Sequence, residues 1–137
     1  MIEELRIRNF KSVRDLTLRL GRFTVLVGPN GCGKSSVLQA AVFASSAELE
    51  SGGWSELSNQ PEARIEIDLH EPSGFRLEFR TTPDAASVPR RSIHGPDRKT
   101  WDQRAGEWRL ILNDAHKASE PLDPAVVDRF GVAFLHP

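Results

Sequence analysis

Hydrophobic and polar side chains alternate in four segments of the chain. The pattern covers residues 5–8 and 16–20 near the N-terminus, and residues 64–70 and 75–81 in the middle. Because successive side chains of a strand point to opposite faces, each segment is predicted to be a half-buried strand. The first two strands are expected to be joined by a long connection over residues 9–15. The turn sequence E-P-S-G separates the last two, which predicts an antiparallel hairpin.

An unbroken apolar run followed by a helical period lies between these two pairs. Residues 22–27 (R-F-T-V-L-V) have the length of a strand that is buried on both faces. Residues 35–49 are predicted to form a helix, because apolar side chains recur at helical spacing and no proline interrupts them. The apolar positions of this helix are Leu38, Ala41, Val42 and Leu49.

The segment between the predicted strand and helix carries the most specific chemistry. Residues 28–35 read G-P-N-G-C-G-K-S and fit G-x-x-x-x-G-K-S/T, the loop that surrounds nucleotide phosphates. Its glycines allow backbone N–H groups to approach an anion closely. Lys34 is expected to contact the outer phosphates and Ser35 to bind Mg²⁺, while the positive end of the helix favours the same anion. A random chain of this length matches about once in two hundred, and the flanking strand and helix make chance rarer still.

The second half of the chain is more polar. The segment from about 82 to 105 holds three prolines among polar residues and is predicted to be an exposed loop or insert. Its basic residues, for which DNA contact and simple solvation both stay open, are Arg90, Arg91, Arg98, Lys99 and Arg104. A strand is predicted over residues 108–112. Asp123 is a predicted N-cap, followed by proline at the start of a short helix over residues 125–130 and a buried strand over 132–135.

Length and composition exclude several classes of protein. With 137 residues the chain is predicted to form a single domain. Its 18 Lys plus Arg and 19 Asp plus Glu give a net charge of -1, which argues against wholesale binding of nucleic acid or anionic membranes. The N-terminus M-I-E-E-L-R has acids where a signal peptide has bases, and no apolar stretch is long enough to span a bilayer, so a cytoplasmic protein is expected. Cys32 is the only cysteine, which excludes an internal disulfide.

Two sequence elements together resemble a known family. L-R-I-R-N-F-K-S-V at residues 5–13, followed by T-V-L-V-G-P-N-G-C-G-K-S-S at residues 24–36, closely resembles the head of the SMC, RecF and SbcC ATPases. OLD-family nucleases and related AAA-type ATPases of bacterial defence systems share this opening. The resemblance implies an α/β P-loop NTPase fold, namely the N-terminal lobe of an ABC-ATPase-type head with an antiparallel β layer packed on a partial α/β core.

The resemblance also implies ligands, partners and site residues. In such heads two copies enclose two ATP molecules, so ATP, Mg²⁺ and a homodimer or partner head are expected, with DNA as a partner of the complete protein and no membrane. Ser35 is the implied Mg²⁺ ligand. The residues implied to bind nucleotide are Asn30, Gly31, Cys32, Gly33, Lys34, Ser35, Ser36 and Lys11.

Two motifs that hydrolysis requires in such heads are not found. One is an apolar strand that ends in Asp-Glu, and the other is a signature loop that contacts the γ-phosphate across the dimer. Residues 110–114 (L-I-L-N-D) are interrupted by Asn113, and L-E-S-G-G at 49–53 follows the predicted helix too soon. The catalytic glutamate is therefore unassigned. The chain is expected to be an incomplete, amino-terminal lobe with negligible turnover on its own.

The leading hypothesis is therefore an ATP-binding lobe of an SMC/RecF/OLD-like ATPase that acts in DNA repair or antiphage defence. One alternative is a non-catalytic module that senses nucleotide or dimerises on it. The other is a small P-loop kinase, which shares the strand, loop and helix but does not have the leading N-F-K-S hairpin.

Overall fold

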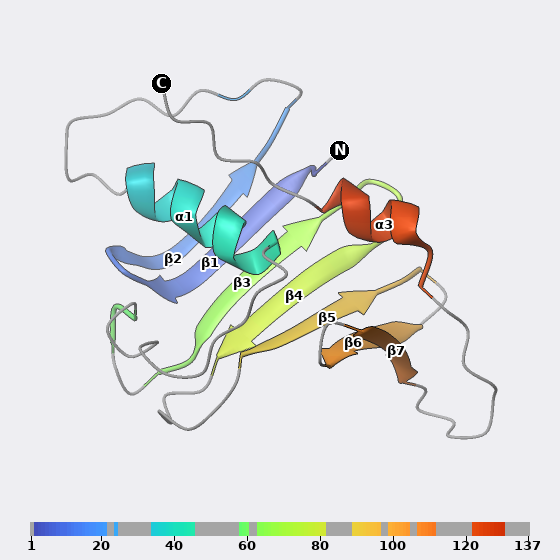
Figure 1. Cartoon of the computed structure of the whole chain (residues 1–137). Helices are drawn as coiled ribbons and strands as arrows, with labels where there is room; N and C mark the ends of the chain where they lie inside the picture. Colours follow the sequence, from blue (N-terminus) through green and yellow to red (C-terminus); the bar gives the residue numbers. More distant parts are fainter. Residues whose placement is uncertain are drawn as a thin grey trace.

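In the described part of the chain, the computed structural model shows one antiparallel sheet with the helices α1 and α3 on one of its faces (Figure 1). The residues that the structure describes are 2–21, 24, 34–45, 58–60, 63–81, 89–96, 99–104, 107–111 and 122–130. The strands are β1 (Glu4–Phe10), β2 (Val13–Arg19), β3 (Ile65–His70), β4 (Arg76–Thr81), β5 (Arg90–His94), β6 (Thr100–Arg104) and β7 (Glu107–Ile111). The helices are α1 (Lys34–Ser45) and α3 (Pro124–Arg129).

The seven strands follow the order β2-β1-β3-β4-β5-β6-β7, and all neighbours are antiparallel. The predicted hairpin is confirmed as β3 and β4, with Ile67 opposite Phe79. Ile67 also lies opposite Ile7 of β1, so a row of large apolar side chains crosses three strands. Gly74 in the β3–β4 turn has a φ of +96°, a conformation that glycine adopts without steric cost.

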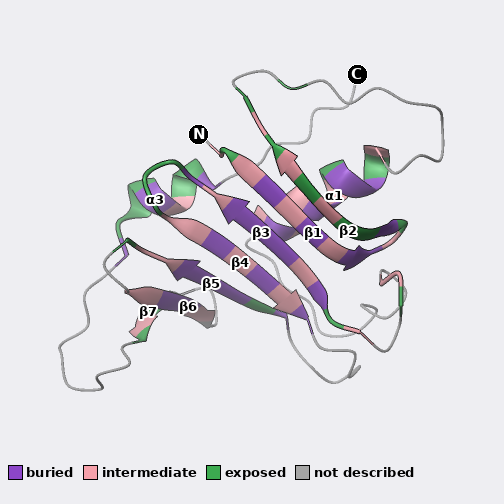
Figure 2. Cartoon of the chain, turned by 180° about the vertical axis from the view of Figure 1, so that it is seen from behind, coloured by how far each residue is buried: buried purple, intermediate pink, exposed green. Residues whose placement is uncertain are grey.

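The hydrophobic core lies between the sheet and α1, which contacts β1, β3 and β4. Buried and less buried residues alternate along β4 and most of β1 (Figure 2), as the hydrophobic pattern predicts. The rings of Phe10 and Phe43 meet edge to face with their centroids 5.8 Å apart, which joins β1 to α1. Arg129 donates two hydrogen bonds to Glu71, at 2.8 and 3.1 Å, and thereby holds α3 to the β3–β4 turn.

The buried face of α1 differs from the predicted one. Val37, Ala40 and Ala44 are buried, whereas Leu38 is 44% exposed. Alanines let the helix axis approach the sheet closely, so the small side chains face the core and Leu38 lies on the flank. There it lines a mainly apolar hollow of about 350 Å³ together with leucines of β1 and β2. Leu49, the last predicted apolar position, lies outside the described residues.

The connection between β1 and β2 is much shorter than predicted. Only Lys11 and Ser12 separate the two strands, because the pairing continues to Phe10 opposite Val13. Asn9 and Lys11 both adopt positive φ, at 58° and 49°. This left-handed conformation, which asparagine tolerates better than most residues, turns Phe10 from the polar face of the sheet into the core.

The prediction of a loop or insert at about 82–105 is wrong for its described part. Residues 90–94 and 100–104 form β5 and β6, and Ile93 and Asp102 are almost completely buried. Polar residues occupy both faces of these strands, so the apolar–polar alternation that marks a strand is hidden. Arg91, which the loop prediction placed in solvent, points into the covered face and is 4% exposed.

The remaining predicted strands and the short helix are confirmed or lie outside the described residues. The predicted strand around residues 108–112 is β7. The predicted short helix is α3, whose N-cap Asp123 accepts a hydrogen bond from the N–H of Ala125 at 3.0 Å. The strands predicted at 22–27 and 132–135 lie outside the described residues, apart from Thr24.

Candidate functional site: the start of helix α1

The structure describes half of the predicted nucleotide-binding residues. Lys34, Ser35 and Ser36 form the first turn of α1, and Lys11 lies in the β1–β2 turn. The other predicted residues, Asn30, Gly31, Cys32 and Gly33, lie outside the described residues. The described part of the site is therefore the junction between the first turn of α1 and the N-F-K-S turn.

The first turn of α1 suits an anion. The leading N–H groups of a helix have no partner within it, and they carry its positive dipole end. The first turn contains no acidic residue, so no internal carboxylate competes for these donors. Ser35 is exposed and Lys34 is partly exposed, whereas Ser36 faces the core. One hydroxyl and one ammonium thus accompany the anion-binding end of the helix, which fits a Mg²⁺–triphosphate ligand.

The N-F-K-S turn is held directly against this part of α1. The hydroxyl oxygens of Ser12 and Ser36 lie 3.1 Å apart. The ammonium of Lys11 donates a hydrogen bond to the side-chain carbonyl of Gln39. Gln39 follows Ser35 by four residues, so both lie on the same side of the helix. Lys11 therefore lies about one helical turn from the predicted Mg²⁺ ligand.

Asn9 anchors the same turn from its other side. Its amide nitrogen donates to the backbone carbonyls of Gln60 and Ala63, at 3.0 and 2.8 Å. Its amide oxygen accepts a hydrogen bond from the N–H of Gln60 at 2.5 Å. Asn59 donates to the carbonyl of Lys11 at 2.7 Å. These bonds hold the positive-φ backbone of the turn in place, and they give the asparagine of N-F-K-S a structural role.

Sequence reasoning missed Gln39 and Asn59, the two amide side chains that hold Lys11. Gln39 could have been found by its spacing, because it follows Ser35 by one turn on the same side of the helix. No local signal marks Asn59, since it meets Lys11 across a separation of 48 residues.

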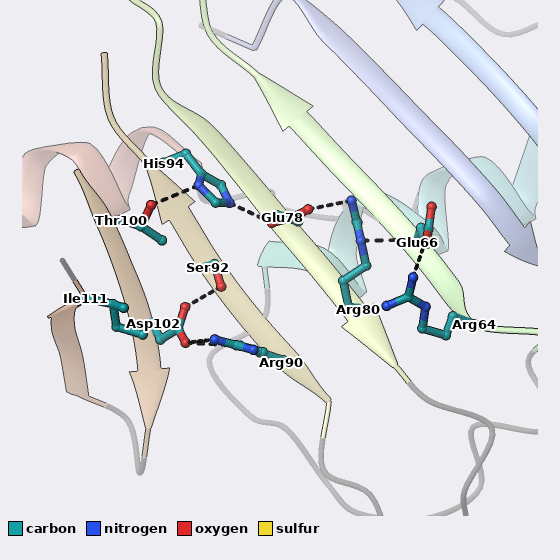
Figure 3. A pocket seen from close by; sticks show the side chains of 10 residues that line it. All are labelled: Arg64, Glu66, Glu78, Arg80, Arg90, Ser92, His94, Thr100, Asp102 and Ile111. Carbon is teal, nitrogen blue, oxygen red and sulfur yellow. Dashed lines mark hydrogen bonds and ion pairs between the residues drawn. The ribbon is translucent and has the colours of Figure 1, made fainter. Parts of the chain in front are cut away.

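The opposite face of the sheet carries a second polar region, a hollow of about 770 Å³ (Figure 3). Arg80 forms two of the hydrogen bonds in this region: it donates to Asp68 at 2.9 Å and to Glu78 at 2.7 Å. Glu78 in turn lies 2.6 Å from the Nε2 atom of His94. The residues that line the hollow are Arg64, Glu66, Glu78, Arg80, Arg90, Ser92, His94, Thr100, Asp102 and Ile111.

The charges of this hollow neutralise one another. The hydrogen bond with His94, aided by the charge of Arg80 and opposed by burial, lowers the pKa of Glu78 from 4.5 to about 2. Asp102 is buried and accepts hydrogen bonds from Ser92 at 2.5 Å and from Arg90 at 3.0 Å. Within the described part of the chain, no group of three or more His, Cys, Asp or Glu side chains is placed to hold a metal ion. The arrangement is that of a cross-strand ion-pair network.

Comparison with known proteins identifies the family of the chain. Residues 23–129 match the model of a family described as "AAA domain, putative AbiEii toxin, Type IV TA system". The chain belongs to this AAA domain family. The family has a P-loop NTPase fold and consists of nucleotide-binding ATPases, and the match includes both the glycine-rich segment and α1.

Two curated relatives match this AAA domain over short segments. An OLD nuclease of Thermus scotoductus is 45% identical over 40 residues, which are 29% of this chain and 8% of that protein. The chromosome partition protein Smc of Methanocaldococcus jannaschii is 44% identical over 43 residues, which are 31% of this chain and 4% of that protein. The predicted resemblance to SMC- and OLD-like AAA ATPases is confirmed. Neither described helix of this AAA domain is long and apolar enough to cross a membrane.

Proposed function

We propose that this AAA domain is the ATP-binding lobe of an ABC-type ATPase head of the SMC/RecF/OLD kind. The observation that carries the proposal is the junction at α1. A sequence that fits the phosphate-loop motif leads directly into a helix whose first turn contacts the N-F-K-S turn through Ser12 and Ser36. Both sequence elements belong to the resemblance, and in the fold they meet on the covered face of the sheet.

Each site residue has a proposed role that follows from its chemistry. Lys34 neutralises the outer phosphates, and Ser35 offers its hydroxyl to Mg²⁺, which shields the phosphate charge when bound. The motif assigns residues 30–33 to phosphate binding as well, and the first N–H groups of α1 are proposed to add further donors. Lys11 is held by Gln39 one turn away and supplies a further positive charge. Residues 1–137 are proposed to act as one domain.

The complete protein is proposed to pair two such heads around two ATP molecules and to hydrolyse them in DNA repair or antiphage defence, in the cytoplasm. The sequence here contains no convincing apolar strand ending in Asp-Glu. Because that glutamate polarises the attacking water in such heads, we propose that residues 1–137 alone bind ATP with negligible turnover.

Calorimetric titration with Mg·ATP tests the proposal, with Lys34→Ala as the decisive variant. Loss of the ammonium removes a charge-assisted contact to phosphate, so we expect affinity to fall at least about tenfold. The matched control is Arg19→Ala, which removes one positive charge from an exposed position on β2. It should leave the dissociation constant within about twofold. If Lys34→Ala and the unmodified chain bind Mg·ATP with equal affinity, the proposed nucleotide site at the start of α1 is wrong.

A second measurement separates the proposed head from a kinase. Incubation of the chain with Mg·ATP and a panel of small metabolites should give no phosphorylated product, because the proposed lobe binds the nucleotide without transferring its γ-phosphoryl group. A kinase would transfer that group to one of the metabolites.

A further inference from the structure

The last turn of α1 is contacted by a buried arginine from another element. Arg91 of β5 is 4% exposed, and its Nε donates a hydrogen bond to the carbonyl oxygen of Ala44 at 2.9 Å. The last carbonyls of a helix have no partner within it and form its negative dipole end, which a cation stabilises. Helix α1 has no basic residue in its own last turn. The cation at this end is therefore supplied by β5.

The remaining groups of Arg91 are held by the two strands beyond β5. Its Nη1 donates to the side-chain carbonyl of Gln103 on β6 at 2.7 Å, and its guanidinium lies over the ring of Trp108 on β7, 5.6 Å from the centroid. Among the described residues Arg91 forms no salt bridge. Burial lowers its pKa to about 10, so the side chain stays charged at neutral pH. The carbonyl of Ala44, the amide of Gln103 and the ring of Trp108 together stabilise the charge of Arg91, which no described carboxylate neutralises.

Helix α1 is thus fixed at both ends by polar contacts to other elements. At its start Ser36 meets Ser12, and at its end Ala44 meets Arg91. A helix of 12 residues is a stiff rod of about 18 Å, so two end contacts together define its direction and its position along its axis. Because the helix is stiff, a change at the contact between Ala44 and Arg91 would also move the start of α1, where Lys34 and Ser35 lie.

We propose that Arg91 is a positioning residue for the nucleotide site, which sets the place of the first turn of α1 by fixing its last turn against β5, β6 and β7. This inference rests on the proposed function, because it assigns Arg91 an effect on phosphate binding. Phosphate contacts depend on donor placement within about 0.5 Å, so a small shift of the helix is enough to weaken them. A bound triphosphate and Arg91 also stabilise opposite ends of the same helix dipole.

The neighbouring residue offers a matched control. Arg90 points to the opposite face of the sheet, where it pairs with Asp102 on β6 and contributes to the ion-pair network. Arg90→Met and Arg91→Met remove the same chemical group from adjacent positions of one strand. Only Arg91→Met releases the last turn of α1.

The test compares dissociation constants for Mg·ATP at a temperature at least about 20 °C below the melting temperature of every variant. At that temperature all variants are folded, so a purely structural role would lower the melting temperature and leave affinity unchanged. We expect Arg91→Met to raise the dissociation constant about five- to twentyfold, and Arg90→Met to leave it within about twofold. Arg91→Lys should fall between them, since lysine restores the charge without the three directed contacts.

Each outcome decides the inference. If the unmodified chain binds Mg·ATP and Arg91→Met binds equally well, the inference is overturned while the proposed function stands. If the unmodified chain does not bind, the proposed function fails and the inference falls with it. Should Arg91→Met not fold, Arg91→Lys decides: a dissociation constant raised at least about threefold supports the positioning role, and an unchanged one overturns it.

Discussion

The two faces of the sheet are stabilised in different ways. On the covered face, α1 and α3 pack over apolar side chains, and only a few polar contacts, such as Arg91 with Ala44, are buried among them. On the open face, carboxylates and guanidiniums pair within and between strands, as Arg80 does with Glu78 on its own strand and Arg90 with Asp102 on the next (Figure 3). The covered face therefore determines where α1 lies, whereas the open face neutralises its own charges and holds none of the described candidate site residues.

The largest expected effect is a cavity in the covered face. Phe79 is completely buried in the centre of the sheet, opposite Ile67 on β3. Phe79→Ala removes a full ring, so it should lower the free energy of unfolding by about 3–5 kcal/mol in urea titrations. A loss below about 1 kcal/mol would show that the covered face is not the main source of stability.

A smaller and pH-dependent effect is expected on the open face. Glu78→Gln removes the charge that His94 and Arg80 stabilise. The pair is partly exposed and screened, so we expect a loss of about 1 kcal/mol at pH 7. Because folding lowers the pKa of Glu78 from 4.5 to about 2, the charged form favours the folded state. This stabilisation is complete above about pH 5 and is lost as the pH falls from 4.5 towards 2.

Urea titrations of both proteins between pH 3 and pH 7 check this sign. The stability difference between the unmodified chain and Glu78→Gln should shrink as the solution becomes more acidic. A difference that grows towards low pH would mean that Glu78 is not held in its charged form by its neighbours.

The smallest expected effect is at the rim of the open face. The Arg64 side chain is 59% exposed and lies 3.6 Å from Glu66. Exposed ion pairs contribute little, so Arg64→Ala should change the free energy of unfolding by less than about 0.5 kcal/mol. A loss comparable to that of Phe79→Ala would contradict the distinction between the two faces.

Much of the fold follows from local pattern. Alternation predicts β1, β2, β3 and β4, because apolar and polar residues alternate along most of each strand, and the Asp-Pro pair predicts the start of α3. The pattern fails at β5 and β6. There Arg91 occupies a core position that is apolar in an ordinary strand, and its charge is accepted only because α1, β6 and β7 supply partners from elsewhere in the chain.

The candidate site also has residues that the sequence predicts and supporting contacts that it does not. The motif predicts Lys34 and Ser35, because phosphate and Mg²⁺ chemistry needs those residue types at that spacing. The supporting contacts could not be predicted, since Gln39, Asn59 and Arg91 reach their partners across 28, 48 and 47 residues. The exposure of Leu38 has a related cause, because two small alanines bring α1 close to the sheet.

The central claim, that a polyphosphate binds at the start of α1, is tested most directly by amide hydrogen exchange with and without a saturating Mg·ATP analogue. We expect slower exchange in the first turn of α1, at residues 34–37, in the unmodified chain and no change there in Lys34→Ala. Unchanged exchange at this turn in the unmodified chain, under conditions where calorimetry shows the analogue bound, would mean that the nucleotide binds elsewhere.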